Sequence, residues 1–142
     1  MGSLSAVESL QLPVRLHGIQ LGRPVDLLVE TETWHVLGFV VRCGDESTRF
    51  LPFGACQVAD GEIAVASALM LLEDVGFYRS RGISIRALLG GAVVHGGRTA
   101  GSLRDLILGS GHVDELAVER GSAVRRVPAA GSKIEPSRAS AA

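Results

Sequence analysis

The side chains best suited to chemistry are four histidines and two cysteines, which could ligate a metal ion or act as a base and a nucleophile. Structural zinc sites hold such ligands in close pairs, for example Cys-x-x-Cys, because neighbouring ligands must converge on one ion. None of the six residues stands at such a spacing: His17, His35, Cys43, Cys56, His95 and His112. The pattern favours histidines at the surface or at strand ends and reduced, half-buried cysteines, with a cross-strand disulfide as the alternative. No metal or cofactor is predicted.

The sequence carries no pattern typical of a catalytic centre. Neither the Gly-x-Ser-x-Gly elbow of serine hydrolases nor the Gly-x4-Gly-Lys-Ser/Thr phosphate loop occurs. The acidic pairs Asp45-Glu46 and Glu73-Asp74 fit solvated positions on a turn and on a helix face. We therefore predict a protein that is not an enzyme. The opposing hypothesis is a small enzyme or ligand carrier that uses a pocket between two halves of the chain.

Arginine and tryptophan are the residues best suited to an interface. Arg79, Arg81 and Arg86 form the densest basic cluster, which either caps a helix or contacts RNA or an acidic partner. Trp34 stands at a predicted hairpin, where it either covers the mouth of a barrel or anchors a partner. These four residues are the predicted interface candidates.

Composition limits the classes of partner. The chain has 142 residues, of which 46% are hydrophobic, so a core of Leu, Val, Ile and Ala can form. A formal net charge of -1 gives no overall attraction to nucleic acid or anionic lipid. Aromatic residues make up only 4%, which disfavours a platform for stacking bases. No apolar run approaches the ~20 residues of a membrane span, and no signal-peptide pattern opens the chain, so we expect a cytoplasmic protein without a membrane span.

Short strands separated by turns dominate the pattern. β-branched and large apolar residues gather in runs of four to seven between glycine, aspartate and proline positions. The predicted strands are 13–17, 25–29, 36–41, 49–52, 55–58, 62–65, 92–95, 103–108, 113–119 and 124–128. Asp60-Gly61 between two apolar runs is the strongest hairpin signal, and 18–22 and 44–47 are predicted turns.

One segment has the periodicity of a helix. Leu69, Leu72 and Val75 recur at intervals of three, and Ser67 can cap the start. The spacing predicts a single helix from Ala66 to about residue 78, which links the regions of strands on either side.

The two strand regions form an internal repeat. A shift of 79 positions places Gly22 on Gly101 without a gap between residues 13 and 39. The matches fall on turn glycines, on a strand aspartate and on apolar strand positions, which are the places that a shared backbone dictates. The matched pairs are Val14/Val93, Gly18/Gly97, Gly22/Gly101, Asp26/Asp105, Leu27/Leu106, Leu28/Ile107, Val29/Leu108, Leu37/Leu116 and Phe39/Val118.

After a further gap of three positions, Phe50-Leu-Pro52 falls on Arg126-Val-Pro128. We expect Asp26 and Asp105 to be structural, each accepting backbone N–H groups from the preceding glycine turn. The alternative roles are metal binding or general base.

The order of these features resembles the PRC-barrel family. Residues 93–108 read VVHGGRTAGSLRDLIL and are similar to the opening of such a domain, with 113–119 and Val127-Pro128 as its middle and end. In the first half, 22–29, 36–41 and Leu51-Pro52 fill the same places. Family members include the cytoplasmic domain of the photosynthetic reaction-centre H subunit and the C-terminal domain of a ribosome-maturation factor. The resemblance implies a docking or assembly module and brings no catalytic residues.

Together these observations predict a mainly β protein with two small PRC-barrel-like halves joined by one helix. The expected organisation is a flexible N-terminus (1–10), half 1 (11–65), a linker helix (66–82), half 2 (83–134) and a disordered tail (135–142). The last strands of half 2 are expected to be missing or supplied by half 1. The predicted function is protein interaction or assembly, with another protein or with itself as a homodimer. The alternative is an accessory module for RNA or the ribosome that uses the arginine cluster.

Overall fold

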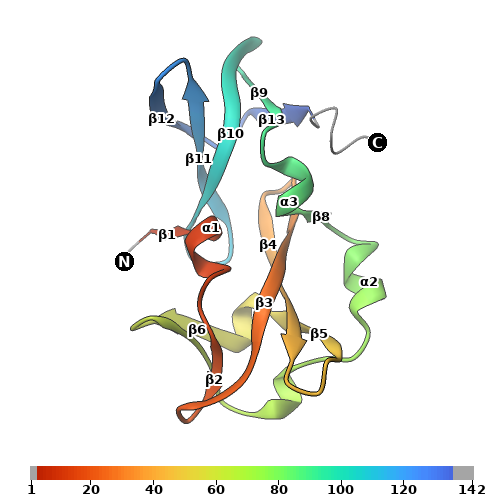
Figure 1. Ribbon diagram of the computed structural model, residues 1–142. Helices are drawn as coiled ribbons and strands as arrows, with labels where there is room; N and C mark the ends of the chain where they lie inside the picture. The colour runs from red at the N-terminus through yellow and green to blue at the C-terminus, as the bar shows by residue number, and fades with distance from the viewer. Residues whose placement is uncertain (1–2, 136–142) are drawn as a thin grey trace.

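The computed structural model describes residues 3–135. It consists of two curled, mainly antiparallel sheets, one per half of the chain (Figure 1). The mainly β class and the two barrel-like halves are confirmed. The N-terminal sheet has the order β5-β4-β3-β2-β7-β6, with β8 added on β3. Its strands are β2 (Val14–Leu16), β3 (Ile19–Glu30), β4 (His35–Cys43), β5 (Thr48–Pro52), β6 (Cys56–Ala59), β7 (Glu62–Val65) and β8 (Ile83–Ser84).

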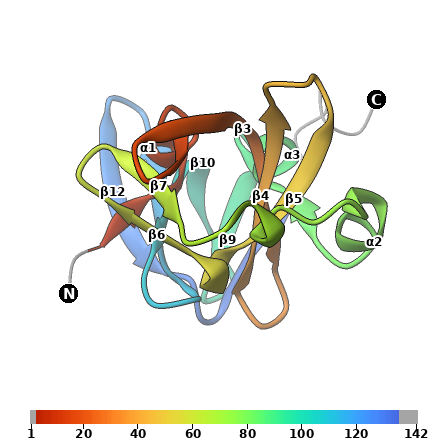
Figure 2. The same cartoon turned by 90° about the horizontal axis from the view of Figure 1, so that it is seen from below.

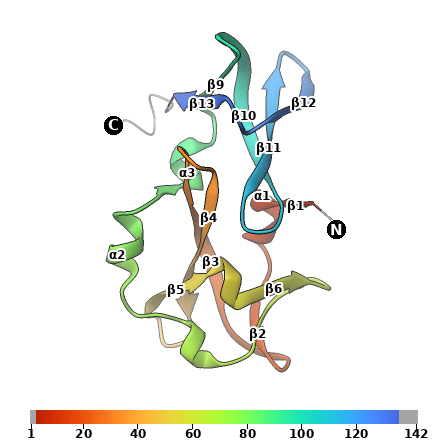
Figure 3. The ribbon, with the colours of Figure 1, turned by 180° about the vertical axis from the view of Figure 1, so that it is seen from behind.

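The C-terminal sheet has the order β12-β11-β10-β9-β13, with β1 added on β10. Its strands are β1 (Leu4–Ser5), β9 (Ala92–His95), β10 (Arg98–Leu108), β11 (Val113–Arg120), β12 (Ala123–Pro128) and β13 (Ser132–Glu135). Every predicted strand corresponds to one of these elements. The view from behind shows that the two sheets follow each other along the long direction of the molecule (Figure 3).

The predicted repeat is visible in the strand register. Val14 lies opposite Gly22 between β2 and β3, and Val93 lies opposite Gly101 between β9 and β10. Both pairs carry a bulge at the same place, and a second bulge precedes both aspartates, at Val25 and at Arg104. A bulge depends on the local backbone path, so two halves with the same bulges share one backbone design.

The repeat departs from the predicted alignment at the second strand of each hairpin. Leu27 lies opposite Phe39, whereas its counterpart Leu106 lies opposite Leu116. The second hairpin is therefore two residues shorter, and Leu116 corresponds to Phe39. The predicted pairings of Leu116 with Leu37 and of Phe39 with Val118 are wrong, because a gap falls inside the hairpin.

The predicted pairing of Pro52 with Pro128 is correct, but two of the three gap positions fall inside the preceding hairpin and only one falls after it. Pro52 lies opposite Gly38 and Pro128 lies opposite Glu115, two equivalent places in the sheets. Half 2 also has its own last strand, since Ile134 of β13 lies opposite Val93 of β9. The expectation that half 2 lacks its closing strands is wrong. What distinguishes half 1 is the extra strand β7 between β2 and β6.

The matched glycines serve two purposes. Gly18 and Gly97 lie in two-residue hairpin turns and have positive φ values of 83° and 78°, which suit glycine. Gly22 and Gly101 lie inside strands, where a Cβ atom would collide with a carbonyl oxygen of the next strand. The predicted turn over 18–22 is therefore wrong beyond Gly18, because β3 begins at Ile19.

The segment before each half packs on the other half. β1 and helix α1 (Ala6–Ser9) precede half 1, yet β1 pairs with β10 of half 2. β8 and helix α3 (Ile85–Leu88) precede half 2, yet β8 pairs with β3 of half 1. The prediction of an unstructured N-terminus is wrong for residues 4–10, since Ala6 and Ser9 are fully buried. Of the predicted disordered tail, Glu135 belongs to β13 and residues 136–142 lie outside the described residues.

The predicted linker helix over 66–82 is wrong as a single element. A 3-10 turn (η2, Ala68–Met70) is followed by an extended stretch and a five-residue helix α2 (Val75–Arg79). Leu72 leaves the helical path because its backbone exchanges two hydrogen bonds of 2.8 Å with Phe50 on β5. Asp74 then caps α2 by accepting from the Phe77 N–H. We call residues 66–82 the connector. Seen from below, the connector runs along one side of the N-terminal sheet (Figure 2).

The two halves share one core. A single cluster contains buried residues from both sheets, including Leu27 and Phe39 from one and Leu106 and Leu116 from the other. The remaining short helical element is η1 (Phe53–Ala55), and Phe53 packs against this cluster.

The two hairpin ends meet within this core. The Val36 N–H donates to Gly111 O at 2.9 Å and the Val113 N–H donates to Trp34 O at 2.8 Å. Trp34 is only 6% exposed and has a φ of 61°, whereas its counterpart in half 2, with a φ of 83°, is Gly111. A tryptophan thus occupies a backbone position that favours glycine, because its ring fills the core between the halves.

Trp34→Ala is expected to destabilise the protein by about 3–5 kcal/mol, the cost of emptying a large aromatic site. Trp34→Gly should be no worse than Trp34→Ala, because glycine relieves the positive φ by about 1 kcal/mol. Urea unfolding followed by circular dichroism measures both. A loss below about 1 kcal/mol for Trp34→Ala would contradict the assigned core role.

Candidate functional site: two aspartate–serine junctions and the sheet faces beside them

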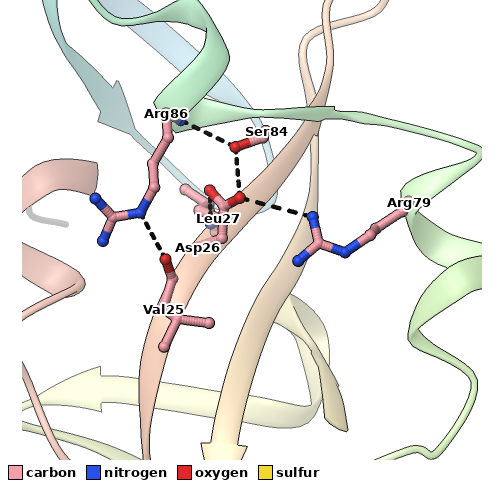
Figure 4. A network of polar contacts seen from close by, with 6 residues as sticks. All are labelled: Val25, Asp26, Leu27, Arg79, Ser84 and Arg86. Atoms are coloured by element: carbon pink, nitrogen blue, oxygen red, sulfur yellow. Dashed lines mark hydrogen bonds and ion pairs between the residues drawn. The ribbon is translucent and has the colours of Figure 1, made fainter. Parts of the chain in front are cut away.

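Asp26 organises the first junction, where the segment before half 2 meets β3 (Figure 4). Its Oδ1 accepts the N–H of Leu27 at 2.9 Å, and its Oδ2 accepts the hydroxyl of Ser84. The same Ser84 oxygen caps α3 by accepting the Arg86 N–H at 3.1 Å. Asp26 is 6% exposed, so these donors compensate for the removal of its carboxylate from water.

The predicted arginine cluster is divided among neighbours of this junction. Arg79 Nη1 lies 3.9 Å from Asp26 Oδ2, and Arg86 Nε donates to the Val25 carbonyl oxygen at 2.6 Å (Figure 4). The Arg81 guanidinium lies over the Phe77 ring, 4.6 Å from its centroid. All three arginines therefore have intramolecular partners, and they do not form one free basic patch.

Asp105 organises an equivalent junction on β10. Its Oδ2 accepts the Ser5 hydroxyl, and its Oδ1 accepts the N–H groups of Val7 at 3.0 Å and Leu106 at 2.8 Å. Ser5 caps α1 by accepting the Glu8 N–H, as Ser84 caps α3. The structural role expected for both aspartates agrees with this geometry. Their expected donors, the preceding glycine turns, are wrong.

The two serine donors were not predicted from the sequence, although the repeat relates them. Ser5 and Ser84 are related by the same shift of 79 positions as Asp26 and Asp105. The repeat therefore begins at Leu4 and Ile83, earlier than the first match at Val14. Extending the alignment toward the N-terminus would have found both serines, but their partners lie 100 and 58 positions away in the sequence.

The outer face of the N-terminal sheet is covered by the connector. Leu28, Val40 and Phe50 form a small cluster that is at most 1% exposed. Tyr78 of α2 stacks on Phe50 with ring centroids 3.9 Å apart and planes inclined by 8°. The connector thus pairs with the β5 edge through Leu72, covers the apolar face through Tyr78 and reaches Asp26 through Arg79.

The equivalent face of the C-terminal sheet forms the floor of a surface pocket, where Ile107 and Ala117 are 5% and 9% exposed. The counterparts of Leu28, Val40 and Phe50 in the register are Ile107, Ala117 and Arg126. A pocket of about 370 Å³ lies here, and its lining includes Asp105 with these three residues. Within residues 3–135, no segment covers this face in the way that α2 covers the other.

The histidines lie at turns and strand ends. His35 and His112 face each other across the meeting point of the two hairpins, with ring centroids 4.3 Å apart. His95 Nδ1 lies 2.8 Å from Ser132 Oγ, and His17 occupies a hairpin turn. In the part of the chain that the structure describes, no three His, Cys, Asp or Glu residues gather as a metal site would require.

The cysteines are free thiols rather than a disulfide. Burial raises the pKa of the Cys56 thiol to about 11, so it is protonated at neutral pH and is a poor nucleophile. The exposed Asp45 belongs to the turn between β4 and β5, where the Ser47 hydroxyl and N–H donate to it and lower the pKa of its carboxyl group. Its geometry is that of a turn residue.

Trp34, the remaining interface candidate, is a core residue. It lines the wall of a pocket of about 770 Å³ together with β13, but its side chain is buried. Of the two alternatives for Trp34, an exposed anchor for a partner is wrong, because the ring packs between the halves.

No protein-family model matches the chain, and no curated protein matches it significantly. Among residues 3–135, no helix has the length and apolar character needed to cross a membrane.

Ser84→Ala and Asp26→Asn are expected to be coupled, because the hydroxyl and the carboxylate are bonded to each other. Ser84→Ala should cost about 1–2 kcal/mol, since it removes a helix cap and a buried partner. In a double-mutant cycle, the double variant should lose less than the sum of the single variants by about 1 kcal/mol. The exposed Ser80→Ala serves as the control, and additive losses would contradict the junction.

Cys56 should resist alkylation by iodoacetamide at pH 7.5. Its pKa of about 11 means that the thiolate fraction, and hence the rate, rises about tenfold per pH unit until the pH approaches that value. Mass spectrometry of a Cys43→Ser variant isolates the Cys56 reaction. A rate that levels off near pH 9 would show an ordinary exposed thiol instead.

Proposed function

We propose that the protein is a non-catalytic interaction and assembly module of the PRC-barrel type that works in the cytoplasm. The observation that carries this proposal is the contrast between the two sheet edges. β5 has its outer edge paired with Leu72 of the connector, whereas β12, its counterpart, pairs within the described chain only with β11. An unpaired strand edge is a template for another strand.

The side chains on β12 support the same function. Residues 123–126 are exposed, and Val124 is 57% exposed at the surface of an otherwise well-packed sheet. Exposed apolar residues beside an open edge favour association with a second chain. The occupant is another protein or a second copy, whose β12 can pair with this one around a two-fold axis.

Val124→Lys is expected to weaken this association, because lysine on an edge strand opposes pairing with another strand. Light scattering after size exclusion should show a dimer for the full chain and a shift toward monomer for Val124→Lys. Ile19→Lys is the matched control, since Ile19 is 68% exposed but lies on β3. A full chain that is monomeric at every concentration and captures no partner from its host would contradict the proposal.

A second proposal is association with RNA or the ribosome. It depends on Arg79, Arg81 and Arg86, whose guanidinium groups contact Asp26, Phe77 and Val25 within the molecule. A true RNA site would lose affinity steeply with salt, in proportion to the phosphates that it contacts. Gel-shift titrations with a structured RNA at two salt concentrations separate these cases, and absent or salt-insensitive binding would remove this function.

A further inference from the structure

The N-terminal sheet binds a segment of its own chain, the connector, along its edge and outer face. Residues 72–79 of the connector contact the sheet at its edge, on its outer face and at its buried aspartate. Leu72 exchanges backbone hydrogen bonds with Phe50 at the edge, Tyr78 stacks on the Phe50 ring, and Arg79 approaches Asp26. The result is an apolar face and an aspartate that are almost completely buried.

The C-terminal sheet has an equivalent position for each receiving group of this arrangement, although only the aspartate is the same residue type. Its edge position is Arg126, its face is formed by Ile107 and Ala117, and its aspartate is Asp105. Asp105 is more exposed than Asp26, although both carboxylates bond to a helix-capping serine in the same way. The pocket at this face therefore occupies the place that the connector fills in the other half.

We propose that this pocket and the edge of β12 bind a segment of a partner protein that carries a tyrosine followed directly by an arginine. The segment would take the path of residues 72–79, with its backbone along β12 and its arginine beside Asp105. This inference deepens the proposed interaction function and depends on it.

The chemistry of the receiving face fits a reversible ligand of this kind. Arg126 replaces Phe50, so the partner's aromatic ring would lie over a guanidinium group, a cation–π contact in place of ring stacking. Ala117 replaces Val40 and leaves more room at the centre of the face. The face is thus less apolar than its covered counterpart, which suits a surface that is exposed to water when unoccupied.

The chain supplies its own probe for this site. A peptide of residues 71–81, LLEDVGFYRSR, is titrated into the ¹⁵N-labelled full chain and followed by chemical-shift changes. The chain is kept at a concentration where light scattering shows the monomer, so that a second copy does not occupy β12. Saturable shifts should appear at Ile107, Ala117 and Arg126. Replacing the peptide's tyrosine or its first arginine by alanine should each weaken binding by about tenfold, the usual size of an interface anchor.

Two chain variants sharpen the test. Arg126→Phe restores the residue of the N-terminal sheet and is expected to tighten binding by about fivefold through aromatic stacking. A gain of affinity cannot arise from misfolding. Lys133→Phe is the matched control, because it adds an aromatic ring to an exposed position of β13, and it should leave the affinity unchanged.

Three results would overturn the inference. One is the absence of saturable shifts, and another is an equal gain from Arg126→Phe and Lys133→Phe. The third is a set of shifts at Leu28 and Val40, which would show that the peptide displaces the connector from its own sheet. If Val124→Lys still disrupts self-association while the peptide fails to bind, the interaction function stands and only this site falls.

Discussion

The fold depends on a carboxylate that must be satisfied by a serine from a distant part of the chain. Asp26 and Asp105 each follow a bulge, and removing such a carboxylate from water without hydrogen-bond donors would be costly. Ser84 and Ser5 supply the compensating hydroxyl, and each also starts the helix that covers the strand. One hydrogen bond thus fixes the strand, the helix and the path of the chain between the halves.

The two halves use this common frame differently. In the N-terminal half, the connector closes both the sheet edge and the outer face, and Arg79 adds a positive charge near Asp26. Within the described residues, the C-terminal half leaves the edge of β12 unpaired, and the face beside it forms the floor of a pocket. A duplicated backbone has therefore given one covered and one uncovered version of the same surface, which explains why we assign the interaction role to the second half.

Much of the fold was accessible from the sequence. The strands were predictable because β-branched runs alternate with turn residues, and the repeat was visible because Gly22 and Gly101 meet the same steric restriction. The apolar spacing of 66–78 predicted one helix, but its apolar residues do not share one buried face. Leu71 is buried in the core and Leu72 pairs with an edge, while Leu69 is 86% exposed.

The candidate site was only partly predictable. The repeat identifies the two aspartates. The groups that bind them come from segments exchanged between the halves, and the local sequence pattern does not predict such an exchange. The arginine cluster looked continuous in sequence, yet the short helix α2 and the strand β8 direct its members to different neighbours. The face on β10 to β12 is recognisable only through its equivalence, in strand register, to the covered face on β3 to β5.

The exchange of β1–α1 and β8–α3 has a consequence for how the molecule can be divided. Cutting the chain in the connector would leave each fragment without the strand and helix that complete its own sheet, while each would carry the missing piece of the other. Each fragment would therefore need the other to complete its sheet. The same arrangement would result from fusing, end to end, the two chains of an ancestral dimer whose subunits had swapped their leading segments.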